Sequence, residues 1–331
     1  TDFSFDYDNF MIDLGNINFL SLKVPSPEDS VRDNYGDEEL FEINTLIQSS
    51  SGELYIDHPN NKSGDKNHSS SLYPIFKTME YSYVYYSHIM NGVYKRQNFF
   101  FEIDTFVIKE IRSFDFFDVK FPGRFSSAGI FSEFYDTLRV RVEDYSLGLE
   151  KSDTITGFDL YPSNGGKAHY YGKIDLSNFG LIGNGKLEYE KSTSLSDGFY
   201  FFPDSTHVLS ADFFINEVSQ GVEFPSVNNS DVFGFYYPYQ DQYKLFNNIQ
   251  RKDFKFKGDA FSFYNNESVF DGDLILKPAG LKGNGIMSFD EFRIESPNFE
   301  YQAQWFKADN SDLSANSFKA NNFNTKIYLD A

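Results

Sequence analysis

Two copies of one glycine-rich motif lie 100 positions apart in this chain. The first copy runs Gly172-Lys-Ile-Asp-Leu-Ser-Asn-Phe-Gly-Leu-Ile-Gly-Asn-Gly185, and the second runs Gly272-Asp-Leu-Ile-Leu-Lys-Pro-Ala-Gly-Leu-Lys-Gly-Asn-Gly285. A fixed internal period is typical of chains built from a repeated structural unit. The positions that match in register are Gly172/Gly272, Leu176/Leu276, Gly180/Gly280, Leu181/Leu281, Gly183/Gly283, Asn184/Asn284, Gly185/Gly285, Ser196/Ser296 and Phe199/Phe299.

Each copy reads as a strand, a reversal and a return strand. In the second copy Lys277-Pro-Ala-Gly280 makes the turn, because Pro suits its first central position and Gly accepts a positive φ. Ser177-Asn-Phe-Gly180 makes the same reversal in the first copy. The Gly-Asn-Gly step that follows favours a β-bulge or a close backbone approach. We therefore predict structural turns at Gly172, Gly180, Gly183, Gly185, Gly272, Gly280, Gly283 and Gly285.

Two further expectations concern the repeat. A positive φ at Gly183 or Gly283 would make Val at that position destabilising by kilocalories. The Ala-Asp steps at Ala211-Asp212 and Ala308-Asp309 are only 97 apart, which predicts a three-residue length difference in a loop.

Alternation of apolar and polar residues recurs along most of the chain. Leu138, Val140 and Val142 alternate with Arg139 and Arg141, as in a strand with one dry face. The 39 Phe and 23 Tyr residues, 19% aromatic with the single Trp, favour pleated surfaces over helix interiors. We predict an all-β protein: an elongated tandem repeat of antiparallel, hairpin-rich units, stacked as a solenoid or a groove.

The polar loops between the strand-like runs predict that the chain has four segments. They are an N-terminal β segment with acidic and polar loops (1–72), an aromatic-rich β unit (73–165), the first repeat copy (166–259) and the second copy (260–331). The strand-like pattern at the last residues predicts that the repeat continues beyond this fragment.

Charge and composition exclude several classes of partner. A formal charge of −20 disfavours nucleic acid, whose phosphates bind clustered Lys and Arg, and an anionic membrane surface. The absence of Cys removes disulfides and thiolate metal sites. No apolar run reaches the roughly 18 residues of a transmembrane helix.

Catalytic motifs are missing from the sequence. The repeated glycines lack the spacing of a dinucleotide-binding loop, and no Gly-x-Ser-x-Gly elbow occurs. Acidic runs lack the spacing of a calcium loop. The histidines His58, His68, His88, His169 and His207 show no zinc-binding spacing. We predict a chain that is not an enzyme and that uses no catalytic residue, metal or cofactor.

The best binding candidate is the Tyr-rich run from Phe233 to Tyr243. Exposed rings beside Asp and Gln can stack on sugars, which makes a ligand site of Phe235, Tyr236, Tyr237, Tyr239 and Tyr243. Alternatively, these rings fill one face of a strand.

Short acidic-Ser/Thr-aliphatic sequences resemble the O-glycan acceptor sites used in the envelopes of some Gram-negative bacteria. They are centred on Ser30, Thr137 and Thr154, with a near match at Ser205.

Five longer segments carry a family resemblance: Tyr171 to Tyr189, Phe201-Phe-Pro-Asp-Ser205, Gly221-Val-Glu-Phe-Pro225, His58-Pro-Asn-Asn-Lys-Ser-Gly64 and Asp144-Tyr-Ser-Leu-Gly148. Together they resemble the repeat region of very large, exported, uncharacterised cell-envelope proteins of Gram-negative bacteria. More distantly, the Gly-Leu-x-Gly-x-Gly turns are similar to the repeats of the AsmA and TamB envelope families, whose long β-grooves are associated with lipid transport.

The resemblance implies an exported protein at the cell surface or in the periplasm of a Gram-negative bacterium. The expected function is a non-catalytic scaffold segment that offers an extended interaction surface to other envelope proteins or to further repeats. Two alternatives stay open: a carbohydrate-binding or adhesion module that uses exposed aromatics, and a lipid-conduit groove with a continuous apolar lining.

Overall fold

The computed structural model describes residues 3–25, 40–64, 72–111, 115–250 and 255–328. The described residues form strands and short 3-10 turns, and none of them lies in an α-helix. The strands of the described residues pair antiparallel, most of them in one large sheet, which confirms the all-β, hairpin-rich prediction. The 3-10 turns are η1 (Met90–Gly92), η3 (Phe116–Asp118), η4 (Pro162–Asn164) and η5 (Tyr264–Asn266).

The chain divides into two compact units. Unit 1 comprises Thr1–Glu150 and Asp175–Gly180, and unit 2 comprises Lys151–Ile174 and Leu181–Ala331. This division does not coincide with the predicted boundaries after residues 72, 165 and 259. Strand β12 (Leu147–Leu160) begins in unit 1 and ends in unit 2.

Unit 1 is a branched antiparallel ladder around β5. One edge of β5 pairs with β2, and its other edge is shared by β6 at one end and β7 at the other. The ladder continues from β7 through β8 and β10 to β11, and from β6 to β9. Its strands are β1 (Phe3–Asp6), β2 (Met11–Leu20), β3 (Lys23–Pro25), β4 (Leu40–Glu42), β5 (Ile47–Tyr55), β6 (Ile75–Thr78), β7 (Ser82–Tyr85), β8 (Phe99–Ile103), β9 (Val107–Ile108), β10 (Lys120–Ser127) and β11 (Phe134–Val140).

Aromatic rings fill the core of unit 1. Phe99 is fully buried, stacks on Tyr94 with ring centroids 4.1 Å apart, and meets the edge of Phe125 at 5.3 Å. Tyr86 is also fully buried and donates its hydroxyl to the carbonyl oxygen of Leu147 at 2.8 Å. Rings can fill this interior because the hydroxyls that enter it find backbone acceptors.

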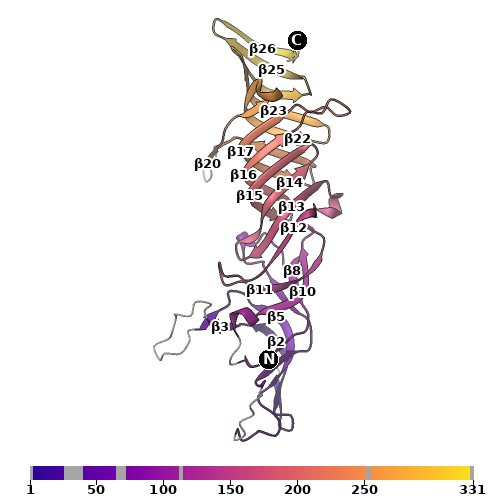
Figure 1. Cartoon of the computed structure of the whole chain (residues 1–331), viewed down its shortest axis with the longest axis vertical. Helices are drawn as coiled ribbons and strands as arrows, with labels where there is room; N and C mark the ends of the chain where they lie inside the picture. Colours follow the sequence, from indigo (N-terminus) through magenta and orange to yellow (C-terminus); the bar gives the residue numbers. More distant parts are fainter. Residues whose placement is uncertain (1–2, 26–39, 65–71, 112–114, 251–254, 329–331) are drawn as a thin grey trace. The chain divides into compact units, whose positions relative to one another are not determined.

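Unit 2 is one long ladder in which hairpin follows hairpin (Figure 1). Pairing runs from β14 through β15 and β16 to β17, and from β22 through β23, β24 and β25 to β26. The short strands β18 and β21 each pair with both β17 and β22 and so join the two copies.

The strands of unit 2 after β12 are β13 (Ala168–Ser177, whose last three residues belong to unit 1), β14 (Gly180–Tyr189), β15 (Ser192–Phe202), β16 (Ser205–Ile215), β17 (Val227–Tyr237), β18 (Gln242–Phe246), β19 (Asn248–Gln250), β20 (Lys255–Lys257), β21 (Phe261–Phe263), β22 (Ser268–Lys277), β23 (Gly280–Phe289), β24 (Phe292–Tyr301), β25 (Trp305–Ala315) and β26 (Phe318–Tyr328).

The two copies share their register down to the irregularities. The pairing of β14 with β15 slips between Gly183 and Gly185, and that of β23 with β24 slips between Gly283 and Gly285, which confirms the predicted bulge. The two copies stay 100 positions apart well beyond the motif, because Leu195 pairs with Asp212 and Glu295 pairs with Asp312. The predicted three-residue length difference is therefore wrong: Ala308 is the counterpart of Val208, and Ala211 that of Ser311.

An aromatic ring lies over one glycine in each copy. A Cβ atom at Gly183 would lie 2.5 Å from the hydroxyl oxygen of Tyr170. At Gly283 it would lie 2.9 Å from Phe270 and 2.9 Å from the hydroxyl oxygen of Tyr301. Neither glycine has a positive φ, so the expectation of positive φ is wrong there, and the steric reason for glycine is the ring. Positive φ values occur instead at the other glycines of the motif, Gly172, Gly180, Gly185, Gly272, Gly280 and Gly285.

The turn of the first copy is held by other parts of unit 1. The backbone N–H of Asn178 donates to the Asp144 carboxylate at 2.9 Å, and its side-chain amide donates to the carbonyl oxygen of Asn44 at 2.9 Å. The corresponding residue of the second copy is Pro278, which has no N–H to donate. The two turns therefore reverse the chain by the same path and differ in what holds them.

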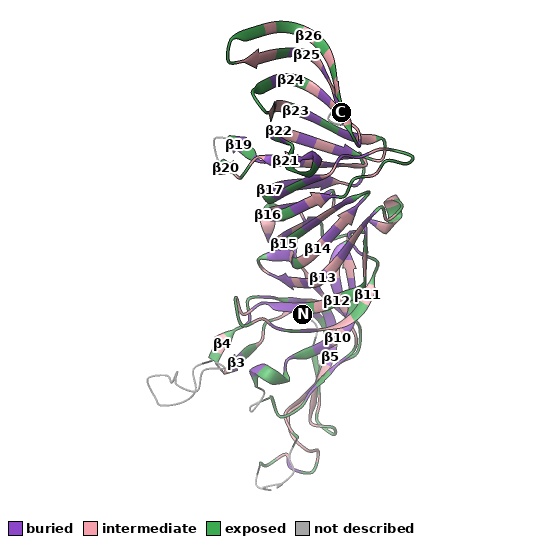
Figure 2. Cartoon of the chain, turned by 45° about the horizontal axis from the view of Figure 1, so that its top comes forward, coloured by how far each residue is buried: buried purple, intermediate pink, exposed green. Residues whose placement is uncertain are grey.

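Aromatic and aliphatic side chains fill the inner face of unit 2. Leu276, Phe299 and Phe306 are completely inaccessible to solvent. Buried residues alternate with more accessible ones along the middle strands, whereas β26 carries no buried residue (Figure 2). Within unit 2, most of the buried apolar residues therefore lie on one face of the sheet.

Candidate functional site

The predicted aromatic site is divided between two faces of β17 and β18. Tyr236 and Tyr243 are 2% and 1% exposed and belong to the ring-filled interior, and Phe235 is 9% exposed. Tyr237 is half-buried, and Tyr239 is exposed in the turn between the strands. The expectation of a shared exposed platform is therefore wrong for Phe235, Tyr236 and Tyr243, because strand alternation sends neighbouring rings to opposite faces.

Phe235 belongs to a small apolar cluster on the outer face of unit 2. It packs with Phe233 and with Ile249 of the β19–β20 hairpin. The edge of its ring also meets His207, with centroids 4.5 Å apart. Burial lowers the pKa of His207 to about 4, so this imidazole is neutral at neutral pH. The cluster covers this part of the outer face and stabilises the sheet by burying apolar surface.

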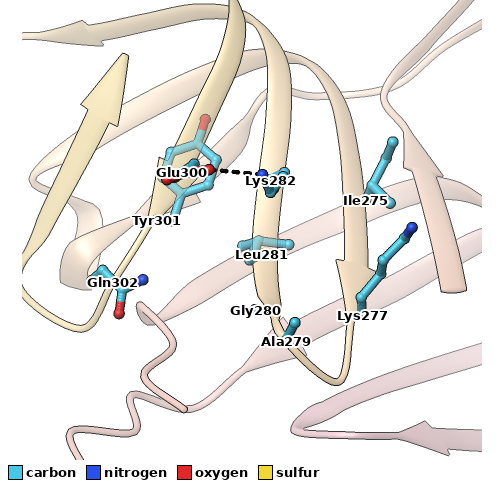
Figure 3. A pocket seen from close by; sticks show the side chains of 9 residues that line it. All are labelled: Ile275, Lys277, Ala279, Gly280, Leu281, Lys282, Glu300, Tyr301 and Gln302. Carbon is cyan, nitrogen blue, oxygen red and sulfur yellow. Dashed lines mark hydrogen bonds and ion pairs between the residues drawn. The ribbon is translucent and has the colours of Figure 1, made fainter. Parts of the chain in front are cut away.

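A pocket of about 510 Å³ lies beside the turn of the second copy (Figure 3). Leu281 and Tyr301 supply apolar surface, and Lys282 contacts Glu300 across β23 and β24, with Nζ and Oε1 2.7 Å apart. Gly280 has open space around it, since no atom lies within 4 Å of where its Cβ would be.

A second hollow, of about 640 Å³, lies over the paired glycines of the first copy. Gly172 and Gly185 leave its floor without side chains, and Lys173, Lys186 and Asp197 stand among the polar groups at its rim. The rim groups contact one another: Lys186 lies over the ring of Tyr171, and Asn184 donates to Asp197 at 2.6 Å.

The two copies differ at the residues that line these hollows. Ile182 and Tyr200 are cross-strand partners in the first copy, where the second copy has the ion pair of Lys282 with Glu300. Likewise Lys186 pairs with Leu195 where Ile286 pairs with Glu295. Neither hollow is therefore a property of the repeat as such.

The predicted O-glycan acceptors lie in different surroundings. Thr154 is exposed beside Ile155, which is 90% exposed, and the Asp153 carboxylate accepts the N–H groups of Ile155 and Thr156. Thr137 is half-buried in β11. Ser205 is 5% exposed and donates to Asp204, so its hydroxyl is not accessible to a modifying enzyme, and this expectation is wrong. Ser30 lies outside the described residues.

Within the described ranges, no three His, Asp or Glu side chains come together as a metal site would require. His58 meets Tyr73 edge-on and His169 contacts Asp159, while His68 lies outside those ranges. Among the same residues, no helix has the length and apolar content needed to span a bilayer.

Comparisons with protein-family models, with curated proteins and with solved structures found no match for this chain.

Proposed function

We propose that this chain is a non-catalytic structural segment of an exported cell-envelope protein, and that it offers its outer faces to other envelope proteins or to further repeats. The observation that carries the proposal is the contrast between the two copies. Their shared residues are mostly those of turns, bulges and core, whereas the outward cross-strand pairs differ, as with Ile182/Tyr200 and Lys282/Glu300. A shared catalytic or ligand site would instead require shared outward groups.

The filled interior also favours a structural role over a lipid conduit. A lipid groove needs a continuous apolar lining that solvent or lipid can reach. In the described part of unit 2 the apolar face is closed, since Leu274, Phe299 and Phe306 have no accessible surface. The acidic exterior of the chain favours solubility.

Photo-crosslinking in intact cells that make the parent protein tests the proposal. A benzoylphenylalanine at Tyr200, which faces outward, is expected to capture envelope proteins or further repeats. The matched control at Phe299, which faces inward, is expected to yield only links within the chain. Capture of cytosolic proteins alone from Tyr200, or turnover of a substrate by the purified chain, would contradict the proposal.

A further inference from the structure

We propose that unit 1 binds a neutral oligosaccharide across the outer face of its sheet, at a row of six side chains that we call the outer row. The strand register places the six directly opposite one another in turn: Phe19, Gln48, Tyr83, Glu102, Arg124 and Tyr135. They come from β2, β5, β7, β8, β10 and β11, so the row crosses the sheet perpendicular to its strands. At about 4.8 Å per strand the row is roughly 24 Å long, which is enough for several sugar rings.

All members of the outer row point away from the core. The core side of the same strands is occupied by residues such as Val84, Phe101 and Phe125, each with no accessible surface. In contrast, Phe19 and Tyr135 are each 59% exposed. The remaining members are half-buried or exposed, so the row is open to a ligand in solvent.

The centre of the row is a cluster of three half-buried rings. Tyr83 and Tyr85 are 5.8 Å apart and nearly parallel, at 17°, and Phe100 meets Tyr83 edge-on at 5.9 Å. The Tyr83 hydroxyl donates to the Glu102 carboxylate at 3.0 Å, and the guanidinium of Arg96 lies 3.9 Å from the Tyr85 ring centre. These contacts hold the rings in place before a ligand arrives, which lowers the entropic cost of binding.

The chemistry of the row fits a sugar better than a protein or a charged polymer. The rings of Phe19, Tyr83 and Tyr135 are interspersed with the planar polar groups of Gln48, Glu102 and Arg124. Apolar C–H faces and hydroxyl edges of a pyranose therefore both find partners. The polar groups interrupt the apolar surface, whereas protein interfaces have a contiguous apolar centre. One acid and one base within the row balance in charge and select no strongly charged ligand.

A pocket opens beside the row and shares residues with it. It has a volume of about 490 Å³, and its lining includes Gln48 of the row, Tyr85 of the ring cluster, Glu42 and His88. A sugar bound on the rings can place a branch or a terminal unit there. The site is independent of the function proposed for the chain as a whole, and it is distinct from the Tyr-rich turn of unit 2.

Binding of linear neutral oligosaccharides, such as cellohexaose and chitohexaose, to the full chain tests this site. Saturation-transfer NMR and calorimetry are expected to show binding, and Tyr83→Leu is expected to weaken it at least about tenfold, since one stacking and hydrogen-bonding ring is lost. Gln48→Ala should also weaken binding. This second variant keeps the test valid if circular dichroism shows that Tyr83→Leu does not fold. The matched control, Tyr239→Leu in unit 2, should bind as the parent chain does.

Any of four outcomes would overturn the proposal. The first three are no binding to any member of a broad neutral-glycan array, unchanged binding by a folded Tyr83→Leu variant, and loss of binding in Tyr239→Leu instead. The fourth is capture of a protein partner, and of no glycan, by the outer row.

Discussion

At the scale of single residues, contact with aromatic rings explains why both copies have glycine at Gly183 and Gly283. Tyr170 covers Gly183, and Phe270 and Tyr301 cover Gly283, so each glycine is the place where a ring meets the backbone directly. The tyrosine hydroxyl reaches the glycine from different strands in the two copies: from β13 at Tyr170 and from β24 at Tyr301. Glycine here provides space for a ring rather than an unusual backbone angle.

Gly283→Ala should therefore lower the free energy of unfolding by about 2–3 kcal/mol, because the new methyl group would lie 2.9 Å from the Phe270 ring and 2.9 Å from the Tyr301 hydroxyl oxygen. Gly198→Ala is the control, since the nearest neighbour of its methyl group would be the flexible Leu209 side chain, at 3.3 Å. Urea denaturation measures both variants. Equal losses at the two positions would show that the rings are not the cause.

Tyr301→Phe should stabilise the chain by about 1 kcal/mol. The Tyr301 hydroxyl is buried and has no hydrogen-bond partner among the described residues, whereas the Tyr170 hydroxyl donates to the carbonyl oxygen of Lys173 at 2.7 Å. Removing an unsatisfied buried hydroxyl removes a desolvation cost. Tyr170→Phe is the matched control and should not stabilise. A loss of stability in Tyr301→Phe would mean that the hydroxyl has a partner in solution.

His207 should make the chain less stable in mild acid. Its pKa is lowered to about 4 in the folded state from an ordinary value of 6.5, mainly by burial. The folded state therefore binds fewer protons than the unfolded state, and stability present above pH 6.5 is lost as the pH falls towards 4. Relative to His207→Phe, which keeps a ring but cannot titrate, the parent chain should lose about 2 kcal/mol between pH 7.5 and 5. Urea denaturation midpoints that change equally with pH in the two proteins would show that His207 does not cause the loss of stability.

At the scale of elements, the hairpin turns show how one path is secured by different chemistry. The first turn depends on the N–H of Asn178, which the Asp144 carboxylate accepts, and the second depends on the fixed φ of Pro278. The sequence of each turn thus reflects its surroundings as well as its geometry.

Exchanging the two turn residues tests this asymmetry. Asn178→Pro should cost about 2–3 kcal/mol, because it removes a hydrogen bond to a carboxylate and leaves the partner oxygen unpaired. Pro278→Asn should cost at most about 1 kcal/mol, chiefly through greater freedom of the unfolded chain. Chemical denaturation of both variants measures the difference. The reverse order would mean that the Asp144 contact contributes little.

The same elements show what sequence reasoning can reach. Alternation and repeated turn residues predict the strands, the turns at Gly180 and Gly280 and the bulges before Gly185 and Gly285, because these features depend on local geometry. The predicted length difference at Ala211 is wrong because a two-residue match carries less information than strand register. The faces of Phe235 and Tyr236 could not be assigned because both faces of β17 are covered there, one by the core and one by the β19–β20 hairpin.

The outer row lies beyond sequence reasoning for a different reason. Its six members come from strands spread between Phe19 and Tyr135, and only the pairing register brings them opposite one another. The aromatic strand around Tyr83 is visible in the sequence, but its neighbours across the sheet are not. A site built across strands can therefore be recognised only when the pairing of the strands is known.

At the scale of the whole molecule, alkaline titration should separate buried from exposed tyrosines. Burial raises the pKa of seven tyrosines well above 10, so they stay protonated in the folded chain while exposed ones ionise. The folded state then holds protons that the unfolded state releases, and stability present below pH 10 is lost as the pH rises further. The seven are Tyr86, Tyr170, Tyr189, Tyr236, Tyr243, Tyr264 and Tyr301.

Ultraviolet absorbance near the tyrosinate band measures this behaviour against circular dichroism. We expect two phases in the native chain, the second coinciding with unfolding, and one phase near pH 10 in guanidinium chloride. Complete ionisation of all tyrosines near pH 10 with an unchanged dichroism spectrum would contradict the ring-filled interiors described above.

In each copy, the inner face carries most of the residues that the two copies share, and the outer face carries residues that differ. Because the residues common to both copies lie mainly inside, a duplicated copy can keep the same interior packing while its outward residues are free to diverge. Outward positions such as Ile182 and Lys282 can then acquire new partners without disturbing the fold. Repeats of this kind can thus diversify in what they bind while their interior residues stay the same.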